Sequence, residues 1–176
     1  VANFTANVVS VIDAGANAVI TTIPISGPVD VVVNHAGTRL YVADGTGIAV
    51  VDTATNAVVD AITPVGLGAL SAVAISNDDA RLYAWSSANA AVGVFDVATK
   101  AQIGSIPIAS GFSTNGLAVH PSGAPIYLST GANVALIDPA TDTVSATVQL
   151  GPSASINGVA RPDETTSKLK SHRTHI

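Results

Sequence analysis

Short runs of alternating apolar and polar residues, separated by turn residues, extend through most of the chain. Between residues 28 and 62 there are four such runs, each rich in the β-branched residues that a half-buried pleated strand favours. The predicted strands are Pro28–Asn34, Arg39–Asp44, Ile48–Asp52 and Ala57–Ile62. No segment keeps apolar residues at helical spacing, so the pattern predicts essentially no helix.

This pattern recurs along the chain with three separate markers. The first is an apolar run that ends in Asp, at Asp13, Asp52, Asp96 and Asp138, with spacings of 39, 44 and 42 residues. The second begins a few residues later, at Asn17, Asn56, Lys100 and Asp142. The third ends in Tyr, at Tyr41, Tyr83 and Tyr127, with spacings of 42 and 44 residues. Separate markers that recur at similar spacings indicate an internal repeat.

Four-stranded antiparallel units of about 40–45 residues are typical of β-propeller blades. A blade has two apolar faces and buries them only against neighbouring blades. We therefore predict an all-β fold of about four propeller blades, each of four antiparallel strands. The repeated Asp follows a strand and precedes a turn, so its simplest role is to accept a backbone N–H two residues on.

Three motifs resemble the YVTN-type β-propeller repeat: VSVID at residues 9–13, DTATN at 52–56 and TRLYVAD at 38–44. The resemblance covers residues 1–163, with the first and last blades incomplete, and leaves 164–176 as an irregular basic tail. It implies a WD40-like or YVTN-like bacterial module that is secreted, periplasmic or on the cell surface. Such modules act in binding or as scaffolds, while related propellers include lactonases and lyases.

The sequence departs from this repeat in the turns. His35 stands where the pattern has Pro, and 77–80 (Asn-Asp-Asp-Ala) replaces its Pro-Asp-Gly turn. Propellers usually have more than four blades, so we expect this chain to be part of a larger propeller. The alternative is a half-propeller that completes a ring by self-association, since an open array exposes two apolar blade faces that favour a homo-oligomer.

Propellers tend to bind ligands around the central channel, at loops that lead into the innermost strand. The family's strand order places these loops at 25–29, 66–71, 109–116 and 151–158. The ligand-binding candidates there are Asp30, Ser71, Phe112, Asn115 and Asn157. Asp30 is the one ionisable residue among them, so a nearly neutral surface of this kind would suit a protein or glycan ligand.

Composition narrows the class of function. The chain of 176 residues is 48% hydrophobic and 11% charged, with a net charge of −5. Its acidic body has no electrostatic footprint for nucleic acid. Turn residues interrupt every apolar stretch, so we expect no membrane span. The absence of Cys excludes disulfides and thiolate chemistry.

The remaining residues with chemical potential have structural interpretations. His35 and His120 are expected to be surface turn residues, and Trp85 to pack between blades. No set of converging carboxylates and histidines suggests a metal site. We predict no catalytic residue, no metal and no cofactor, hence a non-catalytic binding or scaffold module. The alternative is part of a propeller lactonase or lyase whose site extends beyond this chain.

Overall fold

The computed structural model describes residues 1–109, 116–131 and 133–150. This part of the chain contains fifteen strands in four antiparallel sheets, and no helix. Sheet 1 comprises β1 (Ala2–Asn3), β2 (Val8–Asp13) and β3 (Ala18–Pro24). Sheet 2 comprises β4 (Asp30–Val33), β5 (Arg39–Ala43), β6 (Ile48–Asp52) and β7 (Ala57–Ile62). Sheet 3 comprises β8 (Leu70–Ile75), β9 (Arg81–Ser86), β10 (Ala91–Asp96) and β11 (Gln102–Pro107). Sheet 4 comprises β12 (Leu117–Val119), β13 (Ile126–Thr130), β14 (Asn133–Asp138) and β15 (Thr143–Gln149).

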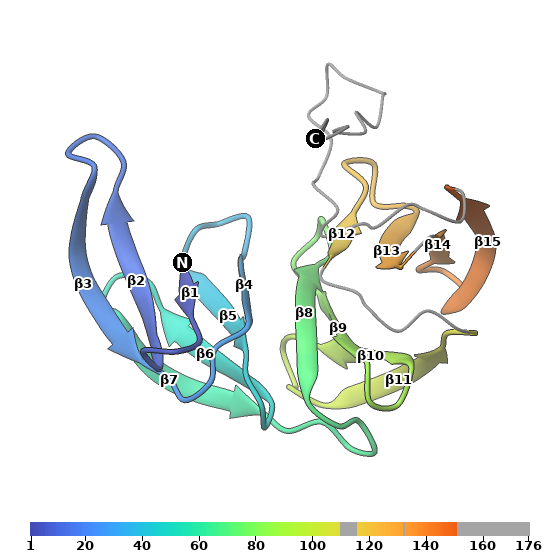
Figure 1. The fold of residues 1–176 in the computed structure, drawn as a ribbon, viewed down its shortest axis with the longest axis horizontal. Coiled ribbons are helices and arrows are strands. Elements are labelled where there is room, and N and C mark those ends of the chain that lie inside the picture. The colour runs from blue at the N-terminus through green and yellow to red at the C-terminus, as the bar shows by residue number, and fades with distance from the viewer. Residues whose placement is uncertain (110–115, 132, 151–176) are drawn as a thin grey trace, which may run out of the picture.

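Each sheet is an up-and-down meander in which consecutive strands pair. Figure 1 shows the four sheets side by side in an open arc. The first strands β4, β8 and β12 lie on the inside of the arc, and the last strands β3, β7, β11 and β15 lie on the outside (Figure 1). The predicted all-β fold, with sheets of four antiparallel strands arranged as blades, is therefore confirmed; sheet 1 has three strands.

Side-chain alternation along the strands gives each inner sheet two buried faces. In β5, Leu40 and Val42 belong to an apolar cluster shared with sheet 1, whereas Tyr41 and Ala43 belong to one shared with sheet 3. A third cluster joins sheets 3 and 4 and contains Trp85, which was predicted to pack between blades. Each interface between neighbouring sheets, called a seam below, thus has its own core.

The repeated Asp forms the turn that its position predicts. The Oδ1 atom of Asp13 accepts the backbone N–H of Gly15 at 2.7 Å, and that of Asp138 accepts the N–H of Ala140 at 2.9 Å. Asp52 accepts the N–H groups of Ala54 and Thr55, two and three residues on, and Asp96 accepts that of Thr99, three residues on. Each of these turns ends with a residue of positive φ, at Asn17, Asn56, Lys100 and Asp142. The second sequence marker therefore records a left-handed backbone position, which Asn tolerates better than most residues.

A β-bulge recurs at the same place in every sheet. The last strand contains one extra residue opposite the strand before it: Ile20, Val59, Ile103 and Ser145. The first three are large apolar side chains that are about half exposed or more. Bulges bend an edge strand and interrupt its ladder, which hinders pairing with another chain. The bulge therefore protects the outer edge of each blade.

Candidate functional site

The sheets present two different ends. Lead-in loops (25–29 and 63–69) enter the first strand of sheets 2 and 3 at one end. First turns (34–38, 76–80 and 120–125) join the first and second strands of sheets 2, 3 and 4 at the other end. The sequence placed its candidate ligand site at the lead-in loops. Of its five residues the structure describes Asp30 and Ser71; Phe112, Asn115 and Asn157 lie outside the described residues.

Asp30 begins β4 and links two sheets. Its Oδ2 atom accepts the backbone N–H of Val73 in β8 at 2.9 Å, and its Oδ1 atom accepts the N–H of Val31 at 2.9 Å. Burial raises the pKa of Asp30, and these two N–H groups oppose the rise. Because its carboxylate is occupied by backbone donors, Asp30 holds the first strands of sheets 2 and 3 together.

Ser71 lies close to this link, on the neighbouring first strand. It is the residue left unpaired where the register of β8 against β9 shifts between Leu70 and Ala72. Its hydroxyl oxygen is buried and, within the part of the chain that the structure describes, has no hydrogen-bond partner. The structure therefore brings Asp30 and Ser71 onto adjacent strands without joining them.

The second lead-in loop is held in the seam between sheets 2 and 3. Val65 donates its backbone N–H to Gln102 Oε1 at 2.7 Å. The Asn89 side chain donates to the Gly66 carbonyl, and Leu67 packs against the apolar cluster of the seam. This loop is thus a fixed part of the blade stack rather than a free channel loop.

In two of the three first turns, the side chain of the first residue accepts the N–H of the residue that follows the turn. Asn34 Oδ1 accepts the N–H of Arg39 and Ser76 Oγ that of Arg81, each at 2.9 Å. In the third turn, His120 Nδ1 accepts the N–H of Ser122, only two residues on, at 3.1 Å. Asn34 and Ser76 thus have the same role in the repeat, and His120 has a different one.

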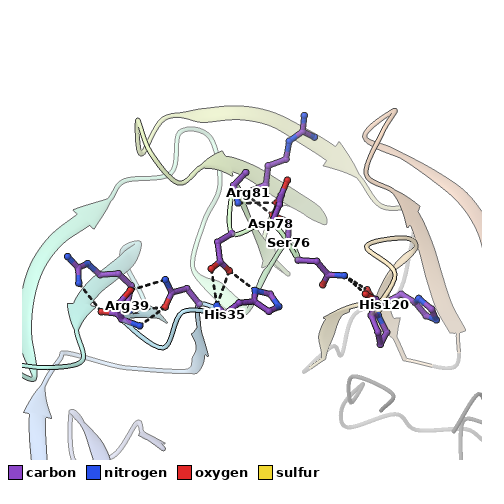
Figure 2. A network of polar contacts seen from close by, with 12 residues as sticks. His35, Arg39, Ser76, Asp78, Arg81 and His120 are labelled. Carbon is purple, nitrogen blue, oxygen red and sulfur yellow. Dashed lines mark hydrogen bonds and ion pairs between the residues drawn. The ribbon is translucent and has the colours of Figure 1, made fainter. Parts of the chain in front are cut away.

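The second residue of the turn reaches across to the next sheet. His35 donates its backbone N–H to both carboxylate oxygens of Asp79 at 3.0 Å, and its Nδ1 lies 2.6 Å from Asp79 Oδ1. Asn77 Nδ2 donates to the carbonyl of His120 at 3.2 Å and to that of Pro121. Figure 2 shows the three turns in a row with these links between them.

His35 and Asp79, which both differ from the residues that the repeat has at these positions, thus contact each other. Asp79 has φ of 58° where the other two turns have Gly37 and Gly123. Although burial acts in the opposite direction, hydrogen bonds from the backbone and side chain of His35, together with its charge, hold the pKa of Asp79 below its ordinary value. His35 lies in a surface turn, as predicted, but its pairing was missed. The signal was that positions 35 and 79 both depart from the repeat.

A cavity of about 320 Å³ opens at the same end, in the seam between sheets 2 and 3. It is lined by residues of the first turn, β5, β6 and the third turn of sheet 3, among them Asn34, Arg39, Tyr41, Val50, Val97 and Lys100. No sequence motif marks these residues as a site, because they come from positions spread over more than one repeat.

The described ranges contain no group of three or more His, Cys, Asp or Glu side chains that could hold a metal ion. In the same ranges, no helix is long and apolar enough to cross a membrane.

No family model and no curated protein matches the chain. Among solved structures, Kuenenia stuttgartiensis hydrazine synthase matches with a TM-score of 0.74 at 23% identity, over 84% of this chain and 44% of that one. The WD40 β-propeller domain of Doa1 matches with a TM-score of 0.71 at 14% identity, over 88% of this chain and 51% of that one. The chain therefore has a β-propeller fold and spans about half the length of both structures.

Proposed function

We propose that the chain is a non-catalytic binding and scaffold module of a β-propeller, which offers its lead-in loops to a protein or glycan. The observation that carries this proposal is the role of Asp30. The ionisable residue among the channel-loop candidates bonds two backbone N–H groups, one of them on the next sheet. A carboxylate used in this way stiffens the surface that the loops present and is poorly placed to act as a base.

The scaffold supports the same role. Apolar clusters shared by neighbouring sheets fix the loops relative to one another. Loops held by a rigid scaffold are common binding elements in proteins. Ser26 and Val29 are exposed on the first lead-in loop and are available to a partner.

A glycan array and a display library of short peptides, both probed with this chain, test the proposal. We expect a selected ligand whose binding falls at least tenfold in Val29→Glu and is unchanged in the control Val58→Glu, on exposed β7. A lactone turned over by the chain, with turnover lost in a folded Asp30→Asn variant, would contradict a non-catalytic role.

A second candidate function, completion of a ring by self-association, is favoured by one repeat position. Val51, Phe95 and Ile137 face the preceding sheet and are 0% exposed. Ile12 occupies the same position in sheet 1, where the described chain provides no preceding sheet, and is 48% exposed. Sheet 1 therefore presents one uncovered half of a seam.

The other end of the arc presents the opposite half. Tyr41 and Tyr83 face the following sheet and are buried, while Tyr127 at the same position of sheet 4 is only half-buried. If sheet 4 of one copy packed on sheet 1 of a second copy, the contact would repeat the internal seams. Two such head-to-tail contacts close a ring, and each arc matches about half of a solved propeller chain.

Light scattering over a range of concentrations tests ring completion. We expect a mass of twice 17.4 kDa at high concentration, reduced to one chain in Ile12→Lys but not in the control Val59→Lys on the outer rim. A wild-type chain that stays monomeric at every concentration would contradict self-association, and the seam halves would then belong to further blades.

We also propose that the repeats are of the YVTN type and that the protein works outside the cytoplasm, in a larger propeller. The support is the set of motifs at 9–13, 38–44 and 52–56. The turn bonds that the repeated Asp makes in all four sheets agree with such a repeat.

A further inference from the structure

The cavity in the seam between sheets 2 and 3 lies at the end opposite the lead-in loops. Its volume of about 320 Å³ is in the range of small-molecule pockets in proteins. Val50 and Val97 provide apolar surface, and Asn34, Arg39 and Lys100 provide polar groups. The first turn, which supplies Asn34 and precedes Arg39 at the start of β5, is fixed by its own hydrogen bonds and by the His35–Asp79 link (Figure 2).

Tyr41 is the aromatic side chain of this site. Its residue is 4% exposed and lines the cavity. Burial raises the pKa of Tyr41, and the charges that act on its hydroxyl are those of Asp79, Arg39 and Lys100.

In the next seam, between sheets 3 and 4, the arginine at the same repeat position crosses from one sheet to the other. Arg81, the counterpart of Arg39, crosses to sheet 4, where its Nη1 donates to the Pro139 carbonyl at 3.0 Å and lies 3.5 Å from Asp142. Arg39 instead turns back to its own sheet and pairs with Asp52 at 2.6 Å. Arg81 therefore bridges the seam between sheets 3 and 4, whereas Arg39 does not bridge the seam between sheets 2 and 3.

The charges around the cavity are already balanced. Arg39 pairs with Asp52, and Lys100 Nζ lies 2.7 Å from Asp60 Oδ2. An anion would have to compete with these carboxylates, while a neutral ligand would not. The guanidinium has five N–H donors and the ammonium three, so both retain donors for a neutral hydroxyl group. Together with the Tyr41 hydroxyl and the two valines, they match a sugar ring, which has hydroxyls at its edge and C–H groups on its faces.

We propose that the cavity lined by Tyr41, Arg39 and Lys100 binds a neutral saccharide unit. Tyr41 exchanges a hydrogen bond with one hydroxyl, the cations donate to others, and Val50 and Val97 pack on the ring. This site is separate from the lead-in loops, so it goes beyond the function proposed above and does not depend on it.

Saturation-transfer NMR and calorimetry with glucose, galactose, N-acetylglucosamine and glucuronate test the site. We expect at least one neutral sugar to bind with a millimolar Kd, and its affinity to fall about tenfold in Tyr41→Phe, which removes the hydroxyl alone. Lys100→Asn is a second variant that preserves the fold, because Asn17 and Asn56 occupy the same left-handed turn position. Tyr127→Phe, on the last sheet, is the control and keeps full affinity.

The other possible results overturn the inference, and they distinguish failure of the saccharide site from failure of the function proposed for the lead-in loops. If no neutral sugar binds, or if Tyr41→Phe and Lys100→Asn both bind as the wild type does, the cavity is not a saccharide site. Binding of glucuronate alone would make it an anion site. Binding that is lost in Val29→Glu but kept in Tyr41→Phe would move the sugar to the lead-in loops and so support the proposed function instead.

Discussion

At the scale of single residues, this chain uses its few charged side chains mainly to bond backbone and neighbouring blades. The repeated Asp closes a turn in each sheet, Asp30 bonds β8, and Asp79 bonds the His35 backbone. In a chain that is 11% charged, most carboxylates described by the structure are thus committed to the fold.

Asp30 should respond differently to two substitutions. Asp30→Ala leaves the Val73 N–H without its acceptor, and an unsatisfied buried group costs about 1–3 kcal/mol. Asp30→Asn keeps an oxygen for this N–H and removes a charge that burial disfavours, so we expect a smaller loss. Urea unfolding at pH 7 measures both. Equal losses would show that the link to Val73 does not stabilise the protein.

The His35–Asp79 link should depend on pH. The pKa of Asp79 is lowered in the folded protein from an ordinary value of 3.8, so its contribution is complete above that pH and is lost as the pH falls below it. We expect Asp79→Asn to lower stability by about 0.5 kcal/mol at pH 7, since the pair is partly exposed. The difference from the wild type should shrink below pH 4. A difference that stays constant from pH 7 to pH 2.5 would contradict this account.

At the scale of elements, the alternation of apolar residues and the turn chemistry were enough to predict the strands. The predicted runs Ile48–Asp52 and Ala57–Ile62 coincide with β6 and β7. The bulge was not predictable, because Val59 and Ile103 are β-branched residues that look like ordinary strand positions. The His35–Asp79 contact could not be predicted, because its members lie 44 residues apart, in the first turns of two different sheets.

The bulge can be tested through Ile103, which is 50% exposed. Its deletion closes the bulge, because Gln102 and Gly104 already lie opposite Phe95 and Val94 and keep their faces. We therefore expect the deletion to change the free energy of unfolding by less than about 1 kcal/mol but to increase self-association, since a regular outer edge pairs more readily with another chain. The control Ile103→Thr keeps the bulge and should associate no more than the wild type. Denaturant unfolding and light scattering compare the two variants, and a deletion that associates no more than the control would show that the bulge does not protect the edge.

At the scale of the whole molecule, stability belongs to the seams rather than to the separate sheets. Every apolar cluster of the described chain joins two sheets. The same repeat position is therefore buried where a neighbouring sheet exists and exposed where none does. Sequence repeats could predict this stacking, but not which ends remain open, because that depends on the curvature of the arc and on what covers it.

Ile12 and Ile137 make the most direct test of this claim, because they are the same residue at the same repeat position. Ile137 is 0% exposed in the seam between sheets 3 and 4, whereas Ile12 is 48% exposed on sheet 1. We expect Ile137→Ala to lower the free energy of unfolding by about 2–5 kcal/mol and Ile12→Ala to lower it by less than about 1 kcal/mol. Urea unfolding of the monomeric chain gives both values, and equal losses would contradict an open stack of blades that depend on their neighbours.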